Sequence, residues 1–140
     1  MIAAPVSEHL QELRRLVQTL TEQHREFALS MDRLDRSIAS AADAEKLQAV
    51  FVRLKDDLTG HVLVEEFEVY PQLMRKNLFD AAISSIMQQH HDVIASLGKM
   101  ELALRLESLP EFRAALEELS SVLRVHQPAE EEKVFALAVN

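Results

Sequence analysis

Apolar residues recur at alternating steps of three and four along nearly the whole chain. This spacing places them on one face of an α-helix, because a helix turns once about every 3.6 residues. The 140 residues include two glycines and four prolines, so the chain offers few sites for tight turns. The sequence therefore predicts a small number of long helices and an all-α fold.

Four periodic stretches can be delimited. Helices are expected over residues 6–37, 43–70, 80–107 and from Ser108 to the C-terminal residues. The connections between them are short, so helices that are neighbours in sequence are expected to pack side by side. We therefore expect an antiparallel, up-down-up-down four-helix bundle that forms a single domain over residues 1–140.

Capping signals support these boundaries. Asp43 and Asp80 each precede a periodic stretch and are suited to accept hydrogen bonds from free helix N–H groups. Ser108 and Glu111 have the spacing of a capping box. Pro71 is expected to end or kink the second helix, because a proline inside a helix removes a hydrogen bond.

Charge and composition exclude several classes of protein. The formal net charge is −8, which disfavours nucleic acid as a partner because phosphate binding needs a basic face. The chain has no cysteine, so disulfides, thiolate metal sites and iron–sulfur clusters are excluded. No apolar run approaches a membrane span and no signal-peptide pattern is present, so no membrane partner is predicted and the cytoplasm is the expected location. The sequence does not define an oligomeric state.

Ionisable side chains stand at core positions of every apolar stripe. These residues are His24, His61, Glu65, His90, His126 and Glu130. Burying them without partners would cost several kcal/mol or more, because a desolvated carboxylate is unfavourable. Metal ions bind imidazole nitrogen and carboxylate oxygen directly. We therefore expect these six residues to be metal ligands.

The pattern is repeated in the two halves of the chain. A histidine and a glutamate four residues apart share one helix face, and this spacing occurs at His61-x-x-x-Glu65 and at His126-x-x-x-Glu130. A further histidine precedes each pair, by 37 residues in the first half and by 36 in the second. The repeat predicts two metal ions, related by approximate two-fold symmetry, between the four helices.

Two other arrangements of the same residues remain open. In the first, each histidine hydrogen-bonds a buried carboxylate and the core contains a polar layer without metal. In the second, two facing histidines ligate a haem, although a haem gives no role to two carboxylates in phase with the histidines.

At these residues the chain resembles the hemerythrin-like HHE cation-binding domains. The resemblance covers nearly the whole chain and rests on His24, His61-x-x-x-Glu65-Glu66 followed by Tyr70-Pro71, His90, and His126-x-x-x-Glu130-Glu131. It implies a bundle that holds a non-haem di-iron centre, with two carboxylates and an oxo or hydroxo group bridging the irons. It also implies reaction with dioxygen (O2) or related small molecules, such as hydrogen peroxide (H2O2) or nitric oxide (NO). The ligand set accepts manganese as well as iron.

The chain departs from the oxygen-carrying members at two positions. Those members have His-x-x-x-His on the third helix, whereas here Ile94 stands four residues after His90. They place an aspartate five residues after the last helix's histidine, whereas here Glu130 stands at four and Glu131 at five. Glu130 is favoured, because it matches Glu65 in the internal repeat.

Two residues keep alternative ligands open. His91 is expected to be exposed, but it becomes the ligand if the third helix is rotated so that His90 faces outward. Pro128 removes a helix hydrogen bond next to the last pair and is expected to kink the helix, which keeps Glu131 open as the alternative to Glu130.

The number of ligands favours reaction over oxygen carriage. Two six-coordinate irons offer about twelve positions, of which two bridging carboxylates, four histidines and an oxygen bridge fill about ten. About one position on each iron stays open, which favours catalase-like decomposition of hydrogen peroxide. The alternative is a module that binds or senses oxygen, iron or nitric oxide without turnover. No catalytic residue is expected beyond the ligands. Tyr70, nine residues after His61, is expected to face away from them unless Pro71 bends the chain.

Overall fold

The computed structural model describes residues 4–39 and 44–140, and these residues contain helices and no strands. The helical elements are α1 (Ala4–Ala39), α2 (Ala44–Val64), α3 (Tyr70–Arg75), α4 (Ala81–Arg105), α5 (Leu109–Glu130) and α6 (Ala136–Ala138), with π-helical turns η1 (Glu65–Val69) and η2 (Glu131–Phe135). The predicted all-α four-helix bundle is confirmed. None of the described helices has the length and apolar content required to cross a bilayer.

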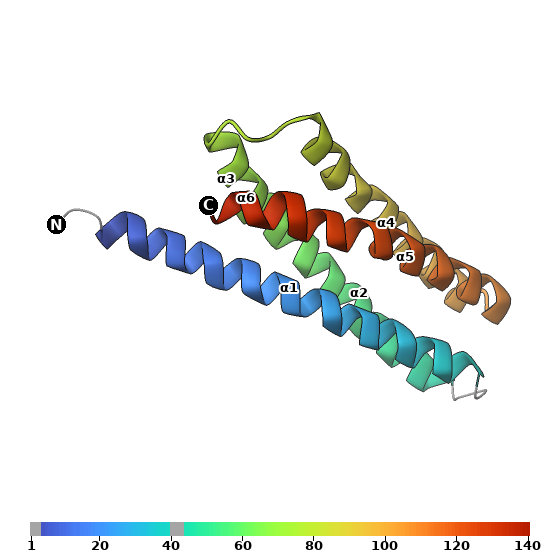
Figure 1. Ribbon diagram of the computed structural model, residues 1–140. Helices are drawn as coiled ribbons and strands as arrows, with labels where there is room; N and C mark the ends of the chain where they lie inside the picture. Colours follow the sequence, from blue (N-terminus) through green and yellow to red (C-terminus); the bar gives the residue numbers. More distant parts are fainter. Residues whose placement is uncertain (1–3, 40–43) are drawn as a thin grey trace.

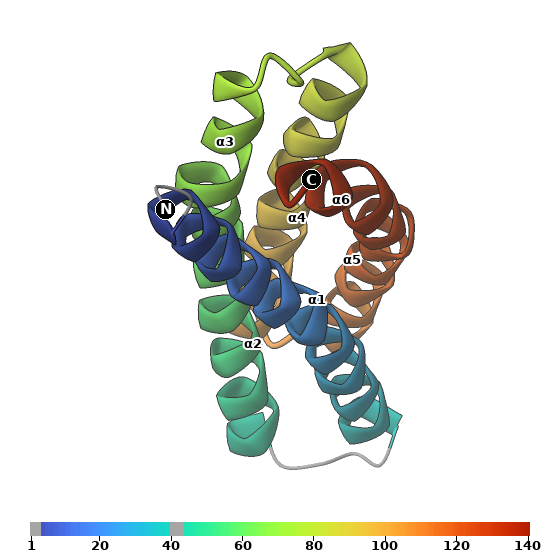
Figure 2. The same ribbon diagram turned by 60° about the vertical axis from the view of Figure 1, so that its left-hand side comes forward.

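Two of the four long segments are each built from three consecutive elements. α2, η1 and α3 follow one another without a break, as do α5, η2 and α6. Figure 1 shows each set as one continuous rod, with the start of α1 and the C-terminal α6 towards the same end of the bundle. In Figure 2, α1 lies in front of the bundle and α4 behind it.

The helix starts follow the capping chemistry of the sequence. The Asp80 carboxylate accepts a hydrogen bond from the backbone N–H of Ile83 at 2.9 Å, and the Ser108 hydroxyl accepts one from that of Glu111 at 3.4 Å. Both predicted caps are therefore confirmed. Asp43, the third predicted cap, lies outside the described residues.

Pro71 does not end the second segment, so the expectation that the helix would end there is wrong. The helix opens into η1 immediately before this residue, and Pro71 occupies the first turn of α3. A proline there loses nothing, because the N–H groups of a first turn have no partner within their own helix. The segment continues to Arg75.

The apolar core consists of two clusters with a polar layer between them. One cluster contains Phe27, Leu58, Val93 and Leu123, and the other contains Leu20, Ile86 and Val134 with their neighbours. His24 stands between Leu20 and Phe27 on α1, so the polar residues lie where the two clusters meet. This arrangement keeps water away from the layer on both sides.

Candidate metal centre

All six predicted ligand residues lie together in the middle of the bundle. α1 contributes His24, α2 His61, η1 Glu65, α4 His90, and α5 His126 and Glu130. Each is buried, with at most 4% of its surface exposed. They form two overlapping groups of four, which share the two glutamates.

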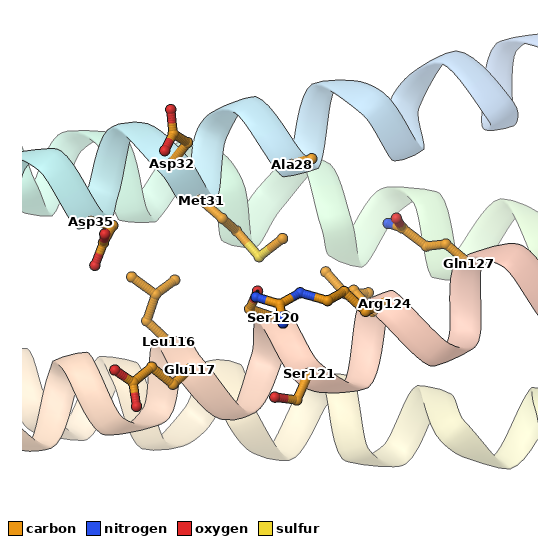
Figure 3. A pocket seen from close by; sticks show the side chains of 11 residues that line it. Ala28, Met31, Asp32, Asp35, Leu116, Glu117, Ser120, Ser121, Arg124 and Gln127 are labelled. Carbon is orange, nitrogen blue, oxygen red and sulfur yellow. The ribbon is translucent and has the colours of Figure 1, made fainter.

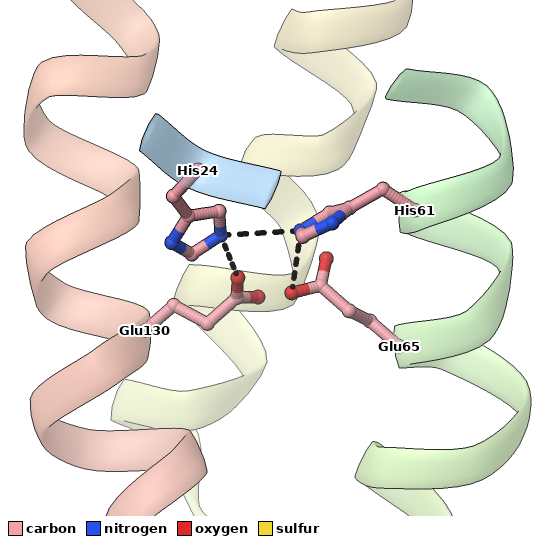
Figure 4. Close-up of side chains that lie close together, drawn as sticks. All are labelled: His24, His61, Glu65 and Glu130. Carbon is pink, nitrogen blue, oxygen red and sulfur yellow. Dashed lines mark hydrogen bonds and ion pairs between the residues drawn. The ribbon is translucent and has the colours of Figure 1, made fainter. Parts of the chain in front are cut away.

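The first group has the spacing of ligands around one ion. Nε2 of His24 lies 3.1 Å from Nε2 of His61 and 3.2 Å from Oε1 of Glu130, and Nε2 of His61 lies 3.2 Å from Oε2 of Glu65. Figure 4 shows these four side chains pointing toward one another. Two ligand atoms about 2.1 Å from one ion, at right angles, are about 3.0 Å apart. The side chains therefore fit a metal ion without rearrangement.

The second group repeats this geometry with the other oxygens of the same carboxylates. Nε2 of His90 lies 3.2 Å from Oε1 of Glu65, and Nε2 of His126 lies 3.3 Å from Oε2 of Glu130. Each glutamate thus has one oxygen in each group. This is the arrangement of a carboxylate that bridges two ions.

The outward-facing nitrogens of the histidines are all held by oxygen acceptors. Nδ1 of His61 lies 2.7 Å from Oε1 of Gln23, and Nδ1 of His126 lies 2.8 Å from Oε1 of Gln89. An amide oxygen only accepts, so Nδ1 carries the proton and Nε2 presents a lone pair to the centre.

For the other two histidines, the acceptor at Nδ1 is a carboxylate. Glu131 lies 3.1 Å from Nδ1 of His24, and Glu66 lies 3.1 Å from Nδ1 of His90. The Nε2 atoms of His24 and His61 therefore turn lone pairs toward each other across 3.1 Å. Such lone pairs repel, and a cation between them converts the repulsion into two bonds.

Several buried polar atoms of the layer make no hydrogen bond. They are both carboxylate oxygens of Glu65, Oε1 of Glu130 and Nε2 of His90. A buried acceptor without a partner costs about 1–3 kcal/mol, and more when charged. Metal coordination would satisfy all four atoms, so the residues present fit a pair of metal ions.

The electrostatics of the layer also favour cations. Burial, reinforced by the neighbouring Glu130, raises the pKa of Glu65 well above its usual range. Burial also acts to raise the pKa of Glu130, but its close contacts with Glu65, His126 and His24 hold that pKa well below its usual range. Burial, followed by repulsion from His24, lowers the pKa of His61 to about 3. His61 is therefore neutral and available as a ligand at physiological pH.

Tyr70 belongs to this layer, and the prediction that it faces away is wrong. Its side chain is fully buried, and its hydroxyl donates a hydrogen bond to Oε2 of Glu130 at 2.8 Å. The cause is η1, which inserts about one extra residue and so turns everything after it by about 100° relative to a regular helix. Burial and the charge of Glu130 raise the pKa of Tyr70, which keeps the hydroxyl protonated.

The other π-turn places a phenylalanine at the matching position. η2 follows Glu130 and brings Phe135 into the core, where its ring stacks on His24 with ring centres 5.6 Å apart. The ring has no hydroxyl, so no counterpart of the Tyr70 hydrogen bond exists here. The two halves of the centre therefore differ at this position.

The structure distinguishes the alternative ligands that the sequence left open. Glu130 lies inside the cluster, whereas Glu131 is at its edge, and its carboxylate contacts the outer nitrogen of His24. His90 is buried and His91 is exposed.

Four positioning residues were missed by reasoning from the apolar stripes. They are Gln23, Glu66, Gln89 and Glu131, which contact the outer histidine nitrogens. The internal repeat carries the signal for them, because glutamine precedes His24 and His90, and a second glutamate follows both Glu65 and Glu130.

Comparison with known proteins gives one match. The family model of the hemerythrin HHE cation-binding domain matches residues 15–138, which include all six clustered residues. No curated protein and no solved structure matches the chain.

Proposed function

We propose that this chain, which belongs to the hemerythrin HHE cation-binding domain family, is a non-haem di-iron protein that decomposes hydrogen peroxide. The observation that carries the proposal is the division of each glutamate between two groups of ligand atoms, which provides two adjacent ion positions. The proposed ligands are His24, His61, Glu65, His90, His126 and Glu130. All come from one domain that we take to span residues 1–140.

The ligand set supports iron and leaves room for a reactant. Each ion would receive two imidazole nitrogens and one oxygen from each glutamate, which fills about four of six octahedral positions. A bridging oxygen would take one more and leave about one open on each ion. Ile94, which stands where the oxygen-carrying members have a further histidine, is 45% exposed and adds no ligand.

When bound, the iron pair would exchange electrons with peroxide, so that two molecules of hydrogen peroxide yield two of water and one of dioxygen. The chain holds the ligand nitrogens deprotonated through Gln23 and Gln89, and it keeps the pocket dry with the apolar clusters on either side. Tyr70 fixes the orientation of Glu130 and keeps a proton next to the centre.

The same site supports a second function, which is binding or sensing of dioxygen or nitric oxide without turnover. The pocket beside the ligands has a volume of about 10 Å³, which is room for about one water-sized molecule. A diatomic gas is of this size.

Metal analysis and oxygen evolution test these functions. Protein expressed with iron and never exposed to chelator is expected to contain about two irons per chain. It is then expected to release one dioxygen for every two peroxides consumed, over many turnovers. The matched control is His61→Ala. Two irons with reversible dioxygen binding and no peroxide consumption would support the binding function instead, and a folded protein without metal would favour a metal-free polar layer.

A further inference from the structure

We propose that the groove between α1 and α5 is the path by which small molecules reach the centre, and that Gln127 at its inner end selects molecules that form hydrogen bonds. This inference rests on the proposed function, because it concerns access to the same ions. It assigns a role to the groove and to Gln127, neither of which takes part in the proposed metal ligation.

The groove and the pocket beside the ligands share a wall. The groove has a volume of about 630 Å³ and is lined by Ala28 and Met31 of α1 and by Leu116 and Ser120 of α5, among others (Figure 3). Leu123 and Gln127 line both the groove and the buried pocket. Among the residues described, a second surface groove, between α4 and α5, shares no lining residue with the pocket.

Gln127 differs in kind from its counterpart in the internal repeat. It follows His126 directly, as Val62 follows His61. Val62 also lines the pocket and is buried and apolar. Nε2 of Gln127 is buried without a hydrogen-bond partner, and an unpaired donor of this kind destabilises the fold where a valine would not. A hydrogen-bonding molecule that passes Gln127 supplies the missing partner.

The internal repeat also shows how the two equivalent faces differ. On the face between α2 and α4, Lys55 and Glu101 form an ion pair that ties the helices together. The corresponding residues between α1 and α5 are Ser120 and Asp35, and both line the open groove. The Ser120 hydroxyl accepts a hydrogen bond from Arg124 of its own helix at 3.1 Å.

The groove indicates the chemical class of molecule that passes. Its lining includes the carboxylates of Asp32, Asp35 and Glu117 and the cation of Arg124, and Asp32 also pairs with Arg36 at 2.7 Å. Three carboxylates against two cations leave the groove negative, so small anions are disfavoured. The Gln127 amide at the inner end favours a molecule with hydrogen-bonding groups over an apolar gas. A small, neutral, hydrogen-bonding oxidant such as hydrogen peroxide meets both conditions.

A bulky residue in the groove tests the path. Ala28 stands four residues after His24 and lines the groove. Ile94 holds the equivalent position four residues after His90, but it is exposed and does not line the groove. We expect Ala28→Phe to slow nitric oxide binding to the reduced, iron-loaded protein at least fivefold, as followed by stopped-flow absorbance. The matched control Ile94→Phe is expected to stay within twofold of the original chain. Metal content and melting temperature are measured for each variant.

A second variant tests the selection by Gln127. Gln127→Val copies Val62 and is expected to slow oxidation of the reduced centre by hydrogen peroxide at least fivefold, with nitric oxide binding within twofold. If Gln127→Val slowed the reactions with hydrogen peroxide and nitric oxide equally, or slowed neither, the selective role of Gln127 would be overturned. Unchanged nitric oxide binding in a fully metal-loaded Ala28→Phe protein would overturn the path, whatever Gln127→Val does. Failure of the original chain to bind metal would instead remove the proposed function, and the path with it.

Discussion

The hydroxyl of Tyr70 donates a hydrogen bond to Oε2 of Glu130, the carboxylate oxygen that also faces His126. Tyr70 comes from the first half of the chain and Glu130 from the second, so this bond joins the two halves at the centre. Phe135 occupies the matching position on the other side and makes no such bond. The half of the cluster that contains His126 is therefore the one with a proton donor beside it.

Tyr70 is expected to resist ionisation in the folded protein. Burial and the nearby carboxylates raise its pKa, so absorbance at 295 nm should not rise as the pH passes about 10, the ordinary tyrosine value. The chain has one tyrosine and no tryptophan, so the signal is unambiguous. In denaturant the same titration should occur near pH 10. Because only the unfolded state loses the proton there, the free energy of unfolding should fall as the pH rises above 10. A normal titration in the folded state would contradict the buried hydrogen bond.

Tyr70→Phe removes the hydroxyl that distinguishes Tyr70 from Phe135 and should separate metal binding from reactivity. The variant is expected to retain its metal, because the hydroxyl is not among the proposed ligands. It should lose about 1.5–3 kcal/mol of unfolding free energy, the contribution of a hydrogen bond to a charged group. The peroxide rate should fall and its pH profile shift, whereas a purely structural role would leave that profile unchanged. Phe135→Leu, which alters the opposite side, is the control.

Removal of a proposed ligand should remove metal and stability together. His61→Ala and Glu65→Ala are each expected to lose metal and to lower the melting temperature of protein purified with iron, because metal binding contributes folding free energy. His91→Ala is the matched control, since that side chain is exposed beside His90. Elemental analysis and calorimetry give both readouts. Full metal retention in both ligand variants would show that the ligands are assigned incorrectly.

The glutamines behind the histidines should tune metal affinity without being ligands. Gln23→Leu removes the acceptor for Nδ1 of His61, and Gln89→Leu does the same for His126. Loss of such a partner typically lowers metal affinity about 10–100-fold. The two variants should behave alike in competition with a coloured chelator. Gln88→Leu, at an exposed neighbouring position, is expected to bind as tightly as the original chain.

Gly60→Ala should stabilise the protein and leave the centre untouched. Gly60 lies inside α2 next to His61, and a methyl group placed there meets no atom within 4 Å. Alanine in a helix is favoured over glycine by about 1 kcal/mol. Gly98→Ala in α4 offers the same change away from the centre, with equally open space. Denaturant unfolding should show similar gains for both, with unchanged metal content.

Periodicity was sufficient to predict the bundle and the cluster. The apolar stripes place each helix face, and polar residues that interrupt a stripe must meet in the core, so all six clustered residues were identified from spacing alone. The caps at Asp80 and Ser108 follow from local chemistry and were also predictable.

Features that depend on a change of helical phase could not be predicted from periodicity. In a regular helix Tyr70 would point away from His61. The spacing of the apolar residues does not predict the π-turn η1, which rotates Tyr70 toward the cluster. The continuation of the helix past Pro71 could not be predicted for the same reason, because η1 places Pro71 in the first turn of α3. The partners of the outer nitrogens depend on which helices face each other, although the internal repeat contained a hint of them.

Each group of clustered side chains contains a glutamate from the other half of the chain, and this has a consequence for synthesis of the chain. The first group of clustered side chains combines His24 and His61 from the first half with Oε1 of Glu130 from the second, so neither repeat is complete alone. A nascent chain whose α5 is still inside the ribosome cannot close this group. Under the proposed function, iron is therefore captured only after α5 has emerged and packed against the other helices.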